Sequence, residues 1–312
     1  FQMSGINPGE AQTLFNETLE KDKDKSTGLA AIETLYEILK RSRSTTVQGM
    51  TADLNKAVEE IVKTDYSSAS IQSASELFLR FISLIQKENE VNPDFTKIRK
   101  EYLTRGDIFI RRIRSSREVI SEWALPLIRN HLNILTHSYS KVVLQAMVAA
   151  KNRGSNFHVF VTESQPDASG KKMCEALRSH GIQTTLILDS AVAYLMSRIN
   201  LVVFGAEGVM ETGGIINKIG TYGIALCAKA MGKCVYVMAE SIKFVRGYPL
   251  NQSDIPDQYK YRFSTLINQK DKLNDEHPLA DYTPPQFINL LITDLGVFTP
   301  AAVGDELIKL YT

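Results

Sequence analysis

Apolar residues at helical spacing run through the first 125 residues of the chain. One stripe keeps the three-to-four-residue spacing of a buried helical face and comprises Leu29, Ile32, Leu35, Ile38 and Leu39. The same spacing continues in residues 76–84 and 108–120, and no β-rich segment interrupts this half of the chain. The pattern therefore predicts an N-terminal helical domain over residues 1–125.

After Pro126 the pattern changes to short apolar runs separated by helical segments. Five runs read as buried strands: residues 133–136, 159–162, 184–188, 201–204 and 234–239. Helical segments that include residues 141–151 and 171–180 lie between them. Strands that alternate with helices form right-handed βαβ units and a parallel sheet covered on both faces. We therefore expect an α/β fold in which a Rossmann-like domain occupies residues 126–312.

Polar residues follow each expected strand, at residues 137–138, 163–165, 189–190, 207 and 240–241. The carboxyl ends of parallel strands share one edge of the sheet, which is where open α/β folds bind ligands. The glycine-rich stretch 205–221 follows a strand and precedes a helix, which brings Glu207, Asn217 and Lys218 toward that edge. The alternative is that these glycines only permit tight turns, because they lack the spacing G-x-G-x-x-G.

Composition and charge narrow the class of protein. The 312 residues are 44% hydrophobic and 23% charged, which supports a large core. Lys+Arg 36 against Asp+Glu 35 gives a net charge of +1, so nothing global favours binding to nucleic acid or a membrane. The apolar runs fall far short of the ~20 residues that span a bilayer. Cys174, Cys227 and Cys234 form no C-x-x-C pair, which argues against disulfides and a metal site and favours the cytosol.

Two segments near the end of the chain have different patterns. Residues 251–285 are long, polar and weakly patterned, which predicts a functional loop or an interface arm. Residues 300–310 predict a final helix, with Thr299 as its cap and Pro300 at its first position. We expect the apolar face of that helix to dock against the domain.

Four motifs carry a family resemblance, at residues 161–167, 205–221, 241–244 and 305–311. They closely resemble the alpha-subunit family of eukaryotic translation initiation factor 2B, over nearly the whole chain. More distantly, the chain is similar to methylthioribose-1-phosphate isomerase and ribose-1,5-bisphosphate isomerase. The resemblance implies a helical N-terminal domain followed by a Rossmann-like domain, the division that the patterns also predict.

The isomerases differ from this chain where their chemistry takes place. Those enzymes move a proton between adjacent carbons of a phosphosugar, which needs a positioned acid and base. Their cysteine after leucine-threonine-histidine is Ser138 here, and their aspartate after glycine-alanine is Glu207. Two arginines that hold phosphate are replaced by Gln165 and Gln48, which removes two bidentate clamps. A serine hydroxyl lacks the acidity of a thiol, so the comparison implies that the chain is not an active enzyme.

What remains resembles a relic ligand pocket without a catalytic residue or a cofactor. The resemblance assigns to it Gln48, His137, Ser138, Gln165, Glu207, Asn217 and Lys218. Such a pocket would hold a sugar phosphate without reacting it. Two alternatives stay open: Asn217 and Lys218 only stabilise a loop, or the chain is a phosphosugar isomerase that still works through Glu207. For His137 we expect a ring bonded to the backbone rather than a catalytic base.

The factor 2B resemblance implies regulation. In that family the alpha subunit forms a homodimer that joins beta and delta subunits, whereas GDP/GTP exchange on initiation factor 2 belongs to other subunits. The core senses factor 2 whose alpha chain is phosphorylated, and exchange is then inhibited. A phosphoserine seeks cations and helix N-termini. Candidates to recognise it are Thr45, Thr46, Arg80, Ser83, Arg111 and Arg114. The alternative for the arginines is a solvated helix face.

Overall fold

The computed structural model describes residues 9–22, 25–64, 68–83, 95–256, 259 and 278–311. The chain divides into two compact units, one up to Ser115 and the other from Ser116. This division falls within one long helix, α5 (Phe95–Ala124). The sequence-based border at residues 125 and 126 instead coincides with the end of that helix, and it remains a prediction.

The first unit is built from amphipathic helices, as the apolar spacing predicts. Before α5 the chain forms α1 (Glu10–Lys21), α2 (Thr27–Arg41), α3 (Val47–Val62) and α4 (Ser68–Ser83). Helix α2 begins where Ser26 accepts a hydrogen bond from the Leu29 amide at 3.2 Å, which satisfies one free N–H of the first turn. Ile32, Leu35 and Leu39 on its predicted apolar face are fully buried.

The second unit contains a seven-stranded sheet in the order β11-β10-β7-β4-β1-β2-β3. Its strands are β1 (Asn133–His137), β2 (His158–Thr162), β3 (Gln183–Ile187), β4 (Leu201–Phe204), β7 (Cys234–Met238), β10 (Leu290–Thr293) and β11 (Gly296–Phe298). All pairs are parallel except β10 with β11. The five predicted strands are confirmed, and β10 and β11 extend the sheet beyond them.

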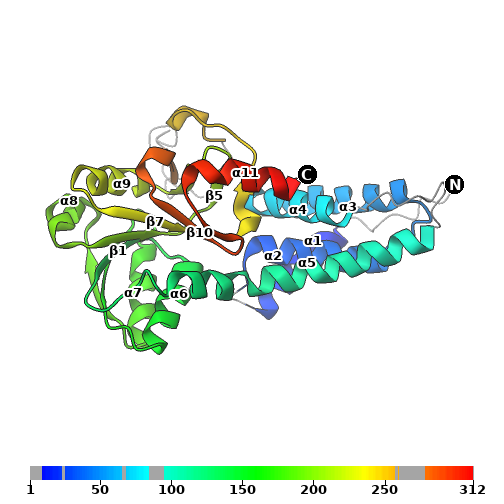
Figure 1. The fold of residues 1–312 in the computed structure, drawn as a ribbon. Helices are drawn as coiled ribbons and strands as arrows, with labels where there is room; N and C mark the ends of the chain where they lie inside the picture. The colour runs from blue at the N-terminus through cyan, green and yellow to red at the C-terminus, as the bar shows by residue number, and fades with distance from the viewer. Residues whose placement is uncertain are drawn as a thin grey trace, which may run out of the picture. The chain divides into compact units, whose positions relative to one another are not determined.

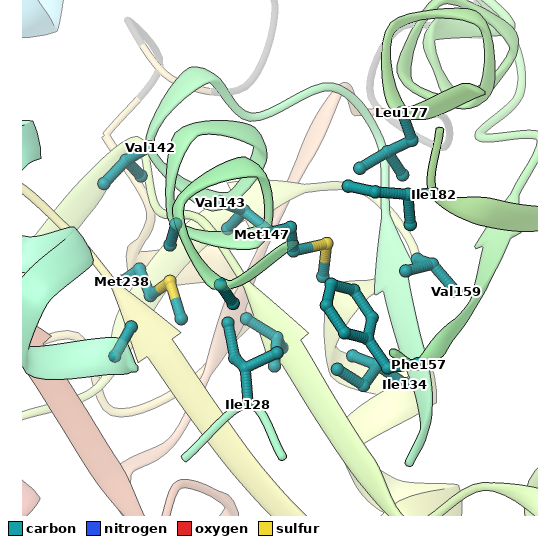
Figure 2. Close-up of a cluster of buried hydrophobic side chains, with 14 of the residues drawn as sticks. Ile128, Ile134, Val142, Val143, Met147, Phe157, Val159, Leu177, Ile182 and Met238 are labelled. Atoms are coloured by element: carbon teal, nitrogen blue, oxygen red, sulfur yellow. The ribbon is translucent and has the colours of Figure 1, made fainter. Parts of the chain in front are cut away.

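Helices cover both faces of this sheet (Figure 1). They are α6 (Lys141–Asn152), α7 (Ser169–Ser179), α8 (Val192–Leu195) and α9 (Thr221–Ala230). Alternate strand residues enter two different cores: Ile134 packs with α6 and α7, whereas Leu135 packs with α8 and α9. Figure 2 shows the first core, in which Met147 of α6 extends toward Phe157.

A smaller sheet, in the order β8-β5-β6-β9, corrects two sequence-based expectations. Its strands are β5 (Gly208–Met210), β6 (Ile215–Lys218), β8 (Phe244–Val245) and β9 (Ala280–Thr283). Residues 205–221 therefore do not run directly from strand to helix, because the antiparallel pair β5–β6 lies between them. Residues 280–283, expected within a loop, form β9. Much of that expected loop, residues 257–258 and 260–277, lies outside the described residues.

The remaining elements close the described chain. Helix α11 (Pro300–Tyr311) begins at Pro300 as predicted, and Val303 on it is fully buried. Short 3-10 turns occur at η1 (Asp189–Ala191), η2 (Met196–Arg198), η3 (Ser241–Lys243), η4 (Gln252–Asp254) and η5 (Pro285–Phe287). Across the described parts of the chain, no helix combines the length and the apolar character that crossing a membrane requires.

Candidate functional site

The strand order of the larger sheet reverses at β1. Strand β1 pairs with β2 on one side, and the chain later returns to place β4 on the other. Open α/β sheets bind ligands outside the carboxyl ends of their strands at such a point. The loops after β1 and β4 approach each other closely there: a Cβ added to Gly205 would lie 2.3 Å from Ser140 Oγ. We use the term carboxyl edge for residues 137–140, 163–169, 189, 205–207 and 240, together with residues 217–222 and 281.

His137 is the last residue of β1, and its buried ring is held from both sides. Nδ1 lies 2.6 Å from Thr162 Oγ1 and 3.0 Å from Ser164 Oγ, and Nε2 lies 2.8 Å from the Ile219 carbonyl oxygen. A carbonyl only accepts, so Nε2 carries the proton and Nδ1 accepts from a hydroxyl. Burial lowers the pKa of His137, which keeps the ring neutral. The predicted bond to the backbone is confirmed, and both ring nitrogens are engaged.

Backbone strain gathers in the loops after β1 and β2. Ser138, Ser164 and Ala168 have φ values of 63°, 57° and 54°, which L-residues adopt only when their surroundings hold them. The Ser138 hydroxyl lies 2.9 Å from the Ser169 hydroxyl and joins the two loops. One hydroxyl is no base for another, so this contact does not activate Ser138 as a nucleophile.

Lys218 forms an ion pair with Asp167 across the carboxyl edge. Lys218 Nζ lies 2.8 Å from Asp167 Oδ2, with side chains 12% and 47% exposed respectively. The other carboxylate oxygen, Asp167 Oδ1, accepts the Ser169 amide at 3.1 Å. Partial burial acts to raise the pKa of Asp167, but the bonds from Lys218 and Ser169 outweigh it and lower that pKa. Asp167 is therefore ionised, and its carboxylate pairs with the Lys218 ammonium.

A second carboxylate, Asp189, holds the backbone of the same loop. Its two oxygens accept the amides of Ser164 and Gln165, each at 2.8 Å. Successive amides beside a left-handed residue form a cradle for an anion. Here the chain fills that cradle with its own carboxylate. The Gln165 side chain is exposed and donates to Glu163 Oε2 at 3.2 Å.

A third carboxylate, Asp281, caps helix α9. Asp281 Oδ2 accepts the amides of Gly220 at 2.7 Å and Tyr222 at 3.1 Å. Its side chain lies opposite Asn217 in the register of β6 and β9, and its Oδ1 is buried without a hydrogen-bond partner among the described residues. Burial raises the pKa of Asp281 to about 7, although the two amides act to lower it. Asp281 therefore exchanges its proton near neutral pH.

Replacing Asp281 with asparagine should change how stability depends on pH. A carboxyl whose folded pKa of about 7 exceeds its ordinary 3.8 stabilises the fold fully below that lower value. This contribution is lost as the pH rises toward 7, by up to ~1.4 kcal/mol per pH unit. The difference in free energy of unfolding between D281N and wild type should therefore shift in favour of D281N between pH 4 and 7. Hydrogen exchange of the α9 amides measures this difference as a function of pH. Glu175→Gln, which removes an exposed carboxylate, is the control. If the stabilities of D281N and wild type change in parallel with pH, the raised pKa of Asp281 is contradicted.

These contacts connect some of the predicted pocket residues of the second unit and not others. Ser138 reaches Lys218 through Ser169 and Asp167, and Asn217 donates to Thr221 Oγ1 at 3.0 Å. The side chain of Glu207 is exposed. Gln48 lies in the other unit, exposed in the first turn of α3. The loop-stabilising alternative for Asn217 and Lys218 has support in these bonds, and their role as ligand residues remains a prediction.

Three aspartates of the carboxyl edge were missed as site residues. Asp167 lies within a quoted motif, and Asp189 within the polar residues that follow β3. The alternating sequence of residues 280–283 is a signal that could have placed Asp281 on a strand. Apart from Ser169, which lies two residues after Asp167, their partners lie 24 to 61 residues away in sequence, so no local pattern identifies these contacts.

The residues predicted to recognise phosphate lie in the helical unit. Thr46 caps α3 by accepting the Gly49 amide at 3.1 Å, and Thr45 beside it is exposed. Ser83 donates to the Arg80 carbonyl oxygen at 2.9 Å, at the end of α4. These hydrogen bonds are those of helix ends, and a role of these residues in recognising phosphate remains a prediction.

Arg111 and Arg114, the two arginines of α5 that are predicted to recognise phosphate, are both paired with carboxylates. Arg111 lies 2.6 Å from Asp107, and Arg114 lies 2.7 Å from Glu33. Both arginine side chains are more than half exposed, at 68% and 60%. The pair of Arg111 with Asp107 is exposed on both sides and contributes little to stability, so Arg111 can exchange its partner. Glu33 is only 11% exposed and also pairs with Lys25 at 2.7 Å, so the pair of Arg114 is held more firmly.

Comparisons with known proteins agree with this fold. Residues 20–300 match the model of the Initiation factor 2 subunit family. The chain is 53% identical to translation initiation factor eIF2B subunit alpha of Caenorhabditis elegans, covering 95% of this chain and 97% of that protein. It is 29% identical to ribose 1,5-bisphosphate isomerase of Thermococcus kodakarensis, covering 86% and 83%.

A solved structure shares the fold at lower sequence identity. A chain of the tetrameric eIF2B-beta2-delta2 complex from C. thermophilum superposes with a TM-score of 0.76 at 18% identity, covering 99% of this chain and 97% of that one. The match over most of the chain, together with the identity to eIF2B subunit alpha, shows that this protein belongs to the Initiation factor 2 subunit family.

Proposed function

We propose that this chain is a non-catalytic regulatory subunit of the nucleotide exchange factor eIF2B, acting in the cytosol. The observation that carries the proposal is the chemistry at the carboxyl edge. Ser138 replaces the cysteine of the isomerases, its hydroxyl contacts the Ser169 hydroxyl in the described part of the chain, and both nitrogens of His137 are engaged. The similarity to eIF2B subunit alpha supports a regulatory role in place of catalysis.

The regulatory role requires assembly and recognition of a phosphorylated partner. We propose that the chain forms a homodimer, joins beta and delta subunits, and helps them sense the phosphorylated alpha chain of initiation factor 2. Its shared fold with a chain of a beta–delta complex supports a paralogous place in such an assembly. Arg111 and Arg114 supply exposed cations, and a phosphoserine dianion can replace the exposed Asp107 carboxylate beside Arg111. Thr45, Thr46, Arg80 and Ser83 remain further candidates.

The test measures mass and exchange with the full chain. We expect mass photometry to show a homodimer that enters a larger particle with beta and delta subunits. Added to an exchange factor that lacks this subunit, the chain should make GDP release from factor 2 sensitive to phosphorylation of the factor's alpha chain. A chain that ignores both subunits, or leaves exchange equally insensitive, would refute the proposal.

A double variant tests whether the two arginines recognise the phosphorylated partner. Arg111→Ala with Arg114→Ala should weaken the inhibition by phosphorylated factor 2 while assembly is unchanged. The matched control is Arg153→Ala, which removes an arginine that is 66% exposed and paired with Glu122 in the other unit. Equal inhibition in the variant and the control would exclude the arginines from phosphate recognition without affecting the assembly result.

The second candidate function is binding of a sugar phosphate that does not react. Lys218 favours it, because a half-exposed carboxylate covers this cation at the carboxyl edge. The similarity to ribose 1,5-bisphosphate isomerase suggests the class of ligand. The bound ligand would stabilise the folded chain by mass action. Sustained turnover of ribose 1,5-bisphosphate that Glu207→Gln abolishes would instead make the chain an isomerase and would overturn both candidates.

A further inference from the structure

The carboxylates of the carboxyl edge differ in how firmly they are held. Glu240 and Asp281 are only 4% and 6% exposed, and Asp189 holds two backbone amides. Asp167 is 47% exposed while its partner Lys218 is 12% exposed. Because Asp167 is half exposed, water competes for its carboxylate, which lowers the cost of moving that carboxylate away from Lys218. Asp167 is thus the carboxylate most easily replaced.

The groups around Asp167 match those that bind a phosphate. Its carboxylate takes the Lys218 ammonium at 2.8 Å and the Ser169 amide at 3.1 Å. Ser169 is the first residue of α7, and its hydroxyl lies beside that of Ser138. An ammonium, a first-turn amide and hydroxyl groups together form a donor set for a tetrahedral oxyanion. A carboxylate, with two oxygens, accepts hydrogen bonds from only some of these donors.

Lys218 cannot easily be left without an anion. Its side chain is mostly buried, and an unpaired buried ammonium is strongly unfavourable. Movement of Asp167 into water therefore needs a second anion to take its place. The loop itself need not unfold, because Asp189 holds the amides of Ser164 and Gln165 independently of Asp167.

We propose that Asp167 is an internal competitor that sets the affinity of Lys218 for phosphate-bearing ligands. A ligand phosphate binds by exchanging with the Asp167 carboxylate, so Lys218 stays paired in both states. This inference rests on the second candidate function, the binding of a sugar phosphate. It adds a residue that controls binding and lies outside the predicted pocket.

The experiment titrates the full-length chain with inorganic phosphate and, separately, ribose 1,5-bisphosphate, using isothermal titration calorimetry. Asp167→Asn removes the charge, but its amide oxygen can still accept the Ser169 amide, so the first amide of α7 keeps its acceptor. We expect this variant to bind both probes roughly fivefold more tightly than wild type. Lys218→Ala should lose binding. Glu122→Gln, which removes an exposed carboxylate paired with Arg153, should match wild type.

The outcomes separate this inference from the functions proposed above. Equal affinity of wild type and D167N, with loss in K218A, would overturn the competitor role and leave the ligand-binding function standing. Weaker binding in D167N would make Asp167 a ligand contact and would also overturn it. Binding of neither probe to any variant would refute both the inference and the second candidate, whereas the exchange assay decides the regulatory proposal independently.

Discussion

Replacement of Gly170 by alanine should lower the free energy of unfolding of the α/β unit by about 3 kcal/mol or more. Gly170 is buried in the first turn of α7, where a Cβ would lie 1.8 Å from the carbonyl oxygen of Thr162. Thr162 ends β2, so its carbonyl oxygen belongs to backbone that strand pairing fixes, whereas Gly170 belongs to the helix. Neither side can yield without shifting α7 from the sheet.

The measurement is hydrogen exchange in β1 and β2, because one unfolding transition does not describe a chain with two compact units. The matched control is Gly223→Ala. Gly223 also lies near the start of a helix, α9, but no atom lies within 4 Å of its added Cβ. The control should gain up to about 1 kcal/mol, because alanine favours a helix over glycine. Equal protection in the two variants would contradict the close approach of α7 and β2.

The parallel sheet was predictable because burial on both faces leaves a simple trace in the sequence. Strand β4 carries four consecutive apolar residues, Leu201–Phe204, all fully or nearly buried. Strand β10 (Leu290–Thr293) has a similar run that the same criterion would have identified. The smaller sheet was not predicted because β5 and β8 span only three and two residues, too few for a periodic pattern to be recognised, and the alternating residues of β9 lie in a segment predicted as a loop.

The carboxyl edge was predictable in place but not in its contacts. Polar residues after each strand mark the edge, and His137 was correctly expected to bond to the backbone. The pairing of Lys218 with Asp167 joins residues 51 positions apart, and Asp281 caps a helix that begins 60 residues before it. Such contacts depend on how β6, β9 and the loop after β2 are assembled, which no local spacing records. The carboxylates that fill the edge therefore became apparent only in the structure.

Replacement of Glu240 by glutamine should lower the free energy of unfolding of the α/β unit by about 3 kcal/mol. Glu240 follows β7 and is 4% exposed, with Arg117 at 2.7 Å and Lys243 at 3.8 Å. Glutamine keeps the shape but removes the charge, which leaves two mostly buried cations without their carboxylate. Lys243 also donates to the Ala206 carbonyl oxygen at 2.6 Å, so its displacement should disturb the loop after β4.

The pH dependence of this loss gives a second measurement. Burial alone would raise the pKa of Glu240, but Lys243 and Arg117 outweigh burial and lower it below the ordinary 4.5. The contribution of Glu240 is therefore fully present above pH 4.5 and disappears as the pH falls toward the folded value. Hydrogen exchange should show E240Q and wild type converging in acid. Glu122→Gln, whose pair with Arg153 is exposed, should cost at most ~1 kcal/mol at pH 7. If E240Q loses no more than this control, the Glu240 ion pairs do not hold the end of β7.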